Sequence, residues 1–464
     1  MYDLRLISAS NILPYFATLI LYGAAHKSAL SVHSNNVGSS LFLDRRKITD
    51  YGYLMHVEHL SLTNFRNYAR LELSLPVNRP IVLHGANAQG KTSLLEAIYY
   101  LAASHSPHAN SDRQLINWRA EDEPMPFARL AAEVEGRGGS FNRVEMALVL
   151  DRAPDGSQRF KKSIRINGVD KRVMDLVGLL AVVLFLPQDL SLIEGSPTER
   201  RRFMDSTLSQ VDRDYVQAMT VYEKALPQRN ALLKRIGDGY ASADELPYWN
   251  DQLVKSGSVI IANRQRFLRE LEMSAQQAHL DLTGKREMLT LRYQPNFLPT
   301  AEGDGQMSFD MFGLDLHRDL SAEQIAPQFE EQLQKEQAES IDRGMTLCGP
   351  HRDELRLNIN GRDAGLYGSR GQARTAVMAL KMAELTWMKD RIGEWPILLL
   401  DEVVAELDAH RRAYLLDRIN GATQTLLTTT EMDIFPSSFV ERATIWEVND
   451  GQIQTEGTLN RKVD

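Results

Sequence analysis

Apolar and polar residues alternate along two neighbouring stretches, HVEHLSLTNF at residues 56–65 and ARLELSL at residues 69–75. This alternation predicts strands with one buried face. The apolar run PIVLHG at residues 80–85 predicts a fully buried strand, and KTSLLEAIYYLAAS at residues 91–104 has the period of an amphipathic helix. Strand, turn and helix therefore follow one another closely in this part of the chain.

Strand-like stretches continue to about residue 186, where LLAVVLFL predicts another buried strand. Between residues 198 and 284 the period becomes helical, which indicates a helical arm. A connection rich in Gly, Asp and Pro follows at residues 297–322, and another helix is predicted at about 322–343. Strands then return and end with PILLLDE at residues 396–402.

These patterns predict an α/β fold that is split by a mainly helical insertion, so that two distant halves complete one sheet. We place the first half of this unit at residues 55–205 and the second half at residues 344–464. The helical arm lobe with its linker occupies residues 206–343, and residues 1–54 form an N-terminal extension.

The extension contains an apolar stretch, and apart from His26 no residue from Leu6 to His26 can carry a charge at pH 7. This length, about 20 residues, would suffice for a membrane anchor. A signal peptide would need a basic start, yet Asp3 offsets Arg5, and Pro14 interrupts the run. We therefore interpret the extension as a poorly ordered segment and expect no membrane association.

Composition narrows the class of protein. The chain has 464 residues, 43% hydrophobic and 25% charged, as in a soluble globular protein with two or three lobes. The formal net charge of −8 means that any contact with DNA must come from a local basic patch. The single cysteine, Cys348, excludes a disulfide framework and favours a reducing compartment, the cytoplasm.

A phosphate-binding loop is the most specific motif. The sequence GANAQGKT at residues 85–92 matches G-x-x-x-x-G-K-[ST] between a predicted strand and a predicted helix. In such a loop, Lys91 neutralises the β- and γ-phosphates of ATP or GTP, and the Thr92 hydroxyl binds Mg²⁺. The expected nucleotide-binding residues are Gly85, Ala86, Asn87, Ala88, Gln89, Gly90, Lys91, Thr92 and Ser93.

Two acidic residues follow the late apolar run. Asp401 and Glu402 come directly after ILLL, and a carboxylate at the end of a parallel strand faces the ligand crevice of such sheets. We expect Asp401 to hold Mg²⁺ and Glu402 to orient or deprotonate the attacking water. The long separation of Asp401 from Lys91 in sequence independently indicates a large insertion.

A second helix start also suits an anion. In GSRGQARTAVMALK at residues 368–381, Ser369, Gly371 and Gln372 stand where a long helix should begin. Exposed N–H groups at a helix start attract phosphate. A plain Ser/Gly helix cap is the alternative.

The order of the motifs along the chain resembles that of the ABC-type ATPase heads of the SMC-like group. In both, a phosphate loop is followed by a long insertion, the stretch SRGQ, and then LLLDE and ELD. Four further stretches resemble the RecF family of bacterial DNA replication and repair proteins: LTNFRNY, LFLPQDLSLIEGSPTERRRFMD, GPHRDEL and LLTTTE. The resemblance runs from Met55 to near the C-terminus. It implies an ABC-type ATPase head with weak ATP hydrolysis, and a homodimer that closes on ATP.

In such a dimer the signature helix of one protomer docks on the nucleotide of the other. The resemblance therefore implies that Ser369, Gly371 and Gln372 complete the partner's site. It also implies that Gln188 senses Mg²⁺ and water, although relatives usually carry an acidic pair at this point. It places Arg66 near the nucleotide, and Thr429 or Thr430 on the side of the γ-phosphate. Asp408 is implied to couple the two sites of the dimer. The resemblance assigns no chemistry to His351 and Arg352, for which a structural turn is an equal interpretation.

Basic clusters are the candidates for DNA contact. They are Arg200, Arg201 and Arg202; Arg159, Lys161 and Lys162; Lys171 and Arg172. Each cluster taken singly is more simply a solvated face. Because no platform of interleaved aromatic residues is evident, contact with the backbone of duplex DNA is favoured over stacking on single strands.

The function implied by the family is ATP-dependent binding at gapped or junction DNA, which helps to load recombinase during repair, the SOS response and fork maintenance. RecR-like and RecO-like mediator proteins are the implied partners. The alternatives are a transport-type ABC ATPase subunit and an SMC-type structural ATPase. Little unbroken heptad sequence between residues 198 and 343 opposes the second alternative.

Overall fold

A computed structural model describes residues 55–120, 123, 125–136, 139–152, 158–297, 319–419 and 422–454. The expectations for the N-terminal extension and for most of the connection at 297–322 lie outside these residues. Within the described ranges, no helix is both long and apolar enough to cross a membrane.

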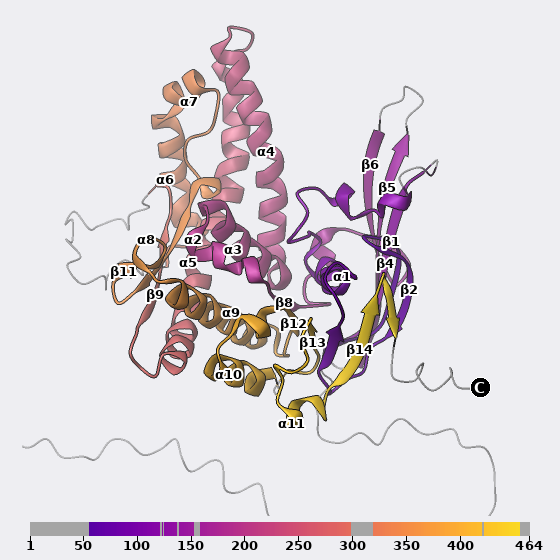
Figure 1. Cartoon of the computed structure of the whole chain (residues 1–464). Helices are drawn as coiled ribbons and strands as arrows, with labels where there is room; N and C mark the ends of the chain where they lie inside the picture. The colour runs from indigo at the N-terminus through magenta and orange to yellow at the C-terminus, as the bar shows by residue number, and fades with distance from the viewer. Residues whose placement is uncertain are drawn as a thin grey trace, which may run out of the picture. The chain divides into compact units, whose positions relative to one another are not determined.

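A six-stranded sheet combines strands from both halves of the chain (Figure 1). Its order is β15-β14-β3-β13-β12-β8, and all neighbours are parallel except β14 and β15. The strands are β3 (Ile81–His84), β8 (Val182–Phe185), β12 (Ile397–Asp401), β13 (Thr425–Thr429), β14 (Thr444–Asn449) and β15 (Gln452–Gln454). The prediction that two distant halves complete one sheet is confirmed.

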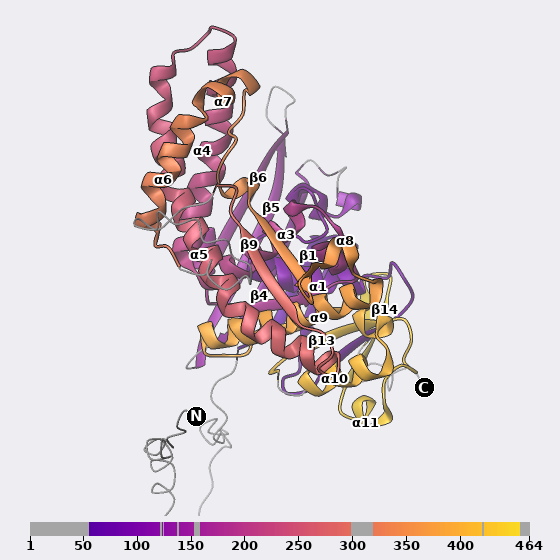
Figure 2. The same ribbon diagram turned by 90° about the vertical axis from the view of Figure 1, so that its left-hand side faces the viewer.

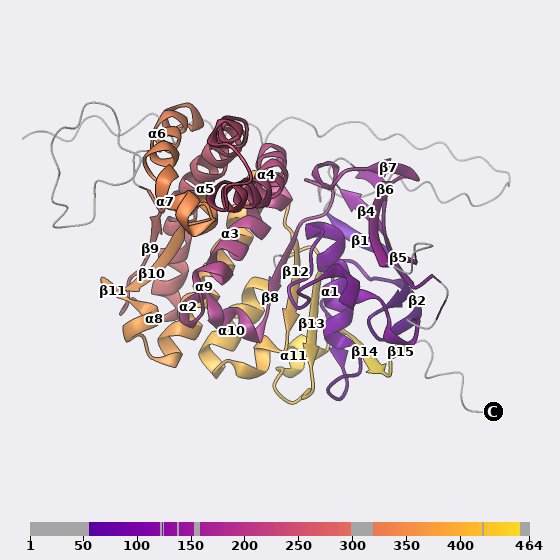
Figure 3. The ribbon, with the colours of Figure 1, turned by 90° about the horizontal axis from the view of Figure 1, so that it is seen from above.

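An antiparallel sheet faces this parallel sheet across helix α1 (Lys91–Ala103), as the view from above shows (Figure 3). Its order is β2-β1-β4-β5-β6-β7. The strands are β1 (His56–Phe65), β2 (Tyr68–Ser74), β4 (Phe127–Gly136), β5 (Ser140–Arg152), β6 (Gln158–Ile166) and β7 (Val169–Lys171). The strands predicted from alternation at residues 56–65 and 69–75 are present.

Alternate residues of the parallel strands belong to two different cores. Ile81 and Leu83 of β3 pack with α1 and the antiparallel sheet, whereas Val82 packs on the opposite face. Helices cover that opposite face: α3 (Pro197–Val211), α9 (Arg370–Ile392) and α10 (Ala409–Ile419), with the short helices α2 (Ser191–Glu194), α8 (Ala364–Tyr367) and α11 (Ser437–Val440) nearby. Burial on both faces explains why these strands read as continuous apolar runs.

The insertion forms the helical arm, which stands beside the sheets in Figure 2. Its helices are α4 (Arg213–Gly237), α5 (Leu246–Leu282), α6 (Ala322–Lys335) and α7 (Gln337–Arg343). The single helix expected at 322–343 is two helices that meet at Glu336. A small sheet of order β11-β10-β9 connects this region to the second half through β9 (Leu289–Gln294), β10 (Glu354–Ile359) and β11 (Arg362–Asp363).

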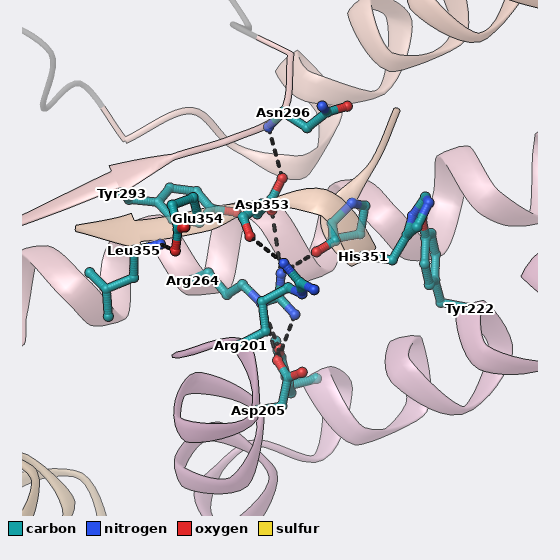
Figure 4. A network of polar contacts seen from close by, with 12 residues as sticks. Arg201, Asp205, Tyr222, Arg264, Tyr293, Asn296, His351, Asp353, Glu354 and Leu355 are labelled. Atoms are coloured by element: carbon teal, nitrogen blue, oxygen red, sulfur yellow. Dashed lines mark hydrogen bonds and ion pairs between the residues drawn. The ribbon is translucent and has the colours of Figure 1, made fainter. Parts of the chain in front are cut away.

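A buried arginine joins the arm to both halves of the sheet unit (Figure 4). The Arg264 guanidinium of α5 donates hydrogen bonds to Asp205 Oδ1 of α3 at 2.7 Å and to the Pro350 carbonyl at 2.7 Å. It also lies 3.3 Å from Asp353 Oδ2, and the Asp353 side chain is fully buried. Burial alone would lower the pKa of Arg264, but the Asp205 and Asp353 carboxylates raise it above its usual value.

The GPHRDEL segment supplies the other side of this junction. The His351 ring lies with Nδ1 2.7 Å from the Tyr222 hydroxyl of α4 and Nε2 3.3 Å from the Thr346 carbonyl. Burial lowers the pKa of His351 to about 4, so the ring is neutral at pH 7. Arg352 donates to the same Thr346 carbonyl at 2.9 and 3.0 Å. In the structure, both side chains hold a joint between the arm and β10.

We predict that Arg264→Ala destabilises the protein, because the carboxylates of Asp205 and Asp353 would lose the buried cation with which both are paired. Removing one partner of a buried ion pair costs about 3–5 kcal/mol in free energy of unfolding. Urea unfolding would measure this loss. The control is Arg202→Ala, which removes an arginine with a 64% exposed side chain and should cost less than about 1 kcal/mol. Equal losses in the two variants would contradict the role given to Arg264.

Candidate nucleotide-binding site

The phosphate loop joins β3 to α1 in a conformation that depends on its two glycines. A Cβ atom at Gly85 would lie 2.3 Å from the Val448 carbonyl oxygen of β14. Gly90 has φ 116°, and a Cβ atom there would lie 2.6 Å from the Asn67 side-chain nitrogen. Both positions therefore exclude larger residues.

Two hairpins hold this loop in place. In the β1–β2 turn, Asn67 donates to the Gln89 carbonyl at 2.9 Å, and the Tyr68 hydroxyl donates to the Gly90 carbonyl at 3.0 Å. At the β14–β15 turn, the Asp450 backbone N–H donates to Gln89 Oε1 at 2.7 Å. The loop is therefore preorganised by residues from both ends of the sequence.

Lys91 is buried inside the loop, with 4% of its side chain exposed. Its ammonium donates to the carbonyls of Gly85 at 2.8 Å and Ala86 at 3.0 Å, and it lies 3.2 Å from Glu402 Oε1. The predicted phosphate-binding cation and the predicted base are therefore in direct contact.

Thr92 meets Asp401 across the site. The Thr92 hydroxyl lies 2.9 Å from both carboxylate oxygens of Asp401, and the Thr428 hydroxyl donates to Asp401 Oδ1 at 2.7 Å. Burial raises the pKa of Asp401, while the two hydroxyl groups oppose that shift. Hydroxyl and carboxylate oxygens are ligands that Mg²⁺ prefers.

The backbone of Glu402 is strained, and this conformation fixes the direction of the side chain. Its φ is 53°, which is uncommon for a residue other than glycine and costs about 1–3 kcal/mol. Its backbone N–H donates to Thr428 Oγ1 at 2.9 Å, so Thr428 holds both acidic residues. The sequence prediction named Thr429 or Thr430 instead, but the Thr429 hydroxyl is bonded within its own turn to Glu431.

Gln188 and Arg66 both line the same cavity, whose volume is about 670 Å³. Gln188 follows β8, and its side-chain nitrogen lies 2.8 Å from His108 Nδ1. Arg66 makes two hydrogen bonds to the buried Glu96 at 2.7 and 2.8 Å. The remaining lining residues are Asn67, Asn87, Ala88, Gly90, Lys91, Thr92, Ser93, Gln114, Ile116, Trp118, Pro187, Asp401 and Glu402.

Sequence reasoning missed several residues of this site: Asn67, His108, Thr428 and Trp118. The alternation of β13 could have indicated that Thr428 points to the acidic pair, because side chains alternate along a strand. His108 and Trp118 lie in irregular segments, so neither has a periodicity signal.

The three signature residues do not line this cavity. Ser369 caps α9: its hydroxyl accepts from the Gln372 N–H at 3.2 Å, and its own N–H donates to Gln372 Oε1 at 2.9 Å. Ser369 and Gly371 are exposed, and the Gln372 amide also donates to Glu287 at 2.9 Å. Asp408 is half exposed and is paired with Arg411 at 2.7 Å. This second helix start is therefore a surface feature.

The basic residues are distributed differently from the expected clusters. Arg200 is 5% exposed and makes two hydrogen bonds to Glu354 at 2.7 and 2.8 Å, so the expectation of one exposed cluster at residues 200–202 is corrected. Arg201 donates to the Asp353 carbonyl at 2.8 Å, and only Arg202 is exposed. Lys161 is exposed beside Asp151.

A basic groove of about 980 Å³ lies between the β6–β7 hairpin and α4. Its cationic lining residues are Lys162, Arg165, Lys171, Arg172 and Lys224, and the one acidic residue that lines it is Asp170. Lys162 is largely committed to Asp112 at 3.0 Å, and Arg165 to Asp170 at 2.7 Å. Lys171, Arg172 and Lys224 are exposed.

The chain matches the RecF/RecN/SMC N terminal domain family over residues 56–452. It is 43% identical over 410 residues to the DNA replication and repair protein RecF of Chloroflexus aurantiacus, which covers 86% of this chain and 99% of that protein. The RecF protein of Bacillus subtilis is 35% identical over 401 residues, covering 86% of this chain and all of that protein. The solved structure of the recombination mediator protein RecF-ATP in the RecFOR pathway is similar with a TM-score of 0.72 and 27% identity, over 88% of this chain and 99% of that one. The predicted ABC-type head is thereby confirmed.

Proposed function

The chain belongs to the RecF family, and from that membership and the geometry of the site we propose that it is an ATP-dependent DNA-binding protein of replication and recombinational repair. One observation carries the proposal: Lys91, Thr92, Asp401 and Glu402 meet around one cavity although they come from distant parts of the sequence. This arrangement has the parts needed for phosphate binding and hydrolysis.

Binding of the triphosphate uses the loop and its lysine. The backbone N–H groups at the start of α1 and the Lys91 ammonium stabilise the β- and γ-phosphates. The oxygens of Thr92 and Asp401, with the Gln188 side chain in the same cavity, suit Mg²⁺, which neutralises phosphate charge when it is bound.

Glu402 is the general base for the attacking water in this proposal. Its carboxylate lies 3.2 Å from the Lys91 ammonium, so a γ-phosphate that attracts Lys91 competes with Glu402 for the same cation. Binding of ATP then leaves the carboxylate able to accept a proton from water. Slow hydrolysis would reset the site.

A second copy of the chain completes the site. Ser369 and Gly371 are exposed and lie outside the cavity of their own protomer, as a surface for a partner's nucleotide requires. Leu366 and Tyr367 of α8, which precede them, have exposed fractions of 73% and 72%. Exposed apolar side chains beside a polar helix start suit an interface between protomers.

Duplex DNA binds along the basic groove in this proposal. Lys171, Arg172 and Lys224 are free to contact phosphates, whereas the buried Arg200 is not. From its family, we place the protein in the cytoplasm, where it acts at gapped or junction DNA with RecO-like and RecR-like proteins. The relatives named RecF match this chain over almost their whole length. This match opposes the SMC-type and transport-type alternatives.

We predict that Glu402→Gln binds ATP at least as tightly as the wild type but does not hydrolyse it. The amide keeps the shape of the side chain, cannot take a proton, and removes the competing negative charge from Lys91. Calorimetry would measure ATP binding, and phosphate release would measure turnover. Hydrolysis at the wild-type rate would remove Glu402 from its role.

Mixing two inactive variants tests the composite site. Ser369→Arg should block docking on a partner's nucleotide, and Lys91→Ala should abolish binding in the loop. Each variant alone should lack ATPase activity. Their heterodimer keeps one complete site, so mixing should restore up to about half of the activity per dimer. No recovery at any ratio would mean that Ser369 acts within its own chain.

We expect the triple change Lys171→Ala, Arg172→Ala and Lys224→Ala to weaken duplex binding uniformly across sequences. The slope of log affinity against log salt should decrease by roughly one for each lost phosphate contact. Filter binding with and without ATP would measure both quantities. The control, Lys255→Ala, removes an exposed lysine from the arm outside the groove and should leave the slope unchanged. A triple variant with a wild-type slope would exclude the groove.

A further inference from the structure

Trp118 is a large apolar side chain in an unusual position. Its exposed fraction is 68%, and it belongs to the wall of the cavity that contains the phosphate loop. The other tryptophans, at positions 249, 387, 395 and 446, are buried or partly buried. An exposed indole in the wall of a cavity offers a ligand a large apolar face.

The backbone around Trp118 is held rigidly although the ring is exposed. Ile116 pairs with Phe65 at the end of β1, and the Asn117 N–H donates to the Asn64 carbonyl at 2.8 Å. The Asn117 side chain is buried and accepts from the Arg119 N–H at 2.8 Å. These bonds fix Trp118 relative to the β1–β2 turn, which also shapes the phosphate loop.

The position of the acidic residues decides which end of the cavity receives the nucleoside. Asp401, Glu402 and Gln188 follow β12 and β8, so the γ-phosphate lies on that side of the loop. Arg66, Asn67, Gln114, Ile116 and Trp118 form a different part of the lining, a wall made by the β1–β2 turn and the segment that pairs with the end of β1. With the γ-phosphate beside Asp401 and Glu402, this wall is the part of the lining that is left for the sugar and base.

The chemistry of that wall suits an aromatic base. The Arg119 guanidinium lies over the Trp118 ring, 5.2 Å from its centroid, and therefore covers one face of the indole. The ring is otherwise largely exposed, and Ile116 adds an apolar surface next to it. Stacking of a nucleobase on an aromatic side chain is worth enough to change affinity by about tenfold or more.

We propose that the indole of Trp118 is the surface on which the base of the bound purine nucleoside triphosphate stacks. The proposal rests on the nucleotide site proposed above. It assigns recognition of the base to Trp118, because the phosphate loop does not contact the base. Trp118 thereby makes the site prefer a nucleotide over a bare polyphosphate.

The test compares ATP with inorganic tripolyphosphate, which carries the same charges without a base. Calorimetry on Trp118→Ala should show ATP affinity reduced about tenfold or more, with tripolyphosphate affinity unchanged. Trp118→Phe keeps an aromatic face and should stay within about threefold of the wild type. The control, Tyr240→Ala, removes an exposed aromatic residue at the arm, 79% exposed, and should bind both ligands normally.

Fluorescence gives a second readout. ATP should change the tryptophan emission of the wild type, and this change should be lost in Trp118→Phe. The calorimetric measurements are repeated in the Ser369→Arg background, in which dimer closure is blocked. The effect of Trp118→Ala should persist there if the base stacks within one protomer.

Three outcomes would overturn the proposal. Wild-type ATP affinity in Trp118→Ala would exclude stacking, and an equal loss of ATP and tripolyphosphate affinity would indicate a general effect on the loop. Loss of the effect in the Ser369→Arg background would place Trp118 in the dimer interface instead. If the wild type itself binds neither ligand, the failure belongs to the proposed nucleotide site.

Discussion

The order of strands in the parallel sheet is the constraint on which the rest of the structure depends. β3 and β8 come from the first half of the sequence, but β13 and β12 of the second half lie between them. The first half therefore cannot form the parallel sheet without the second half, and the insertion must return the chain to the same place. The bond between Thr92 and Asp401, which are 309 residues apart, is a direct consequence of this interleaving. Such non-local pairing is slow to form, so the site is assembled only when nearly the whole chain has folded.

The insertion is tied to the sheet unit at several points. Arg264 joins α5 to α3 and to the segment before β10. Further along α5, Glu270 accepts from the Trp387 indole N–H of α9 at 2.8 Å. Between α5 and β9, Glu287 accepts from Gln372 at the start of α9. These contacts, buried at Arg264 and partly buried at Glu270 and Glu287, join the arm to the signature helix and to the sheet unit.

The local pattern of apolar and polar residues predicted the helices and strands. Contacts between residues that are far apart in the sequence could not be predicted in this way. Strands and helices followed from periodicity, and the phosphate loop and acidic pair followed from fixed spacing within short motifs. The burial of Arg200 could not be predicted, because its partner Glu354 is 154 residues away. Thr428 was missed because the choice among three consecutive threonines depends on which face of β13 meets Asp401. The place of Trp118 in the cavity wall depends on the pairing of an irregular segment with the end of β1, which no local signal specifies.

The fold also determines which basic side chains can contact DNA and which cannot. With a net charge of −8, long-range attraction does not bring the protein to a polyanion, and charges beyond about 8 Å are screened at physiological salt. Only cations that share a surface and lack close acidic partners can then contribute. Arg200 satisfies Glu354 inside the fold, and Lys161 lies beside Asp151. Lys171, Arg172 and Lys224 instead line one groove, in which the acidic residue Asp170 is already paired with Arg165. Asp175, which interacts with Lys171 and Arg172, forms its ion pair with Arg213. Clustering in space, which the fold creates, therefore matters more for this surface than clustering in sequence.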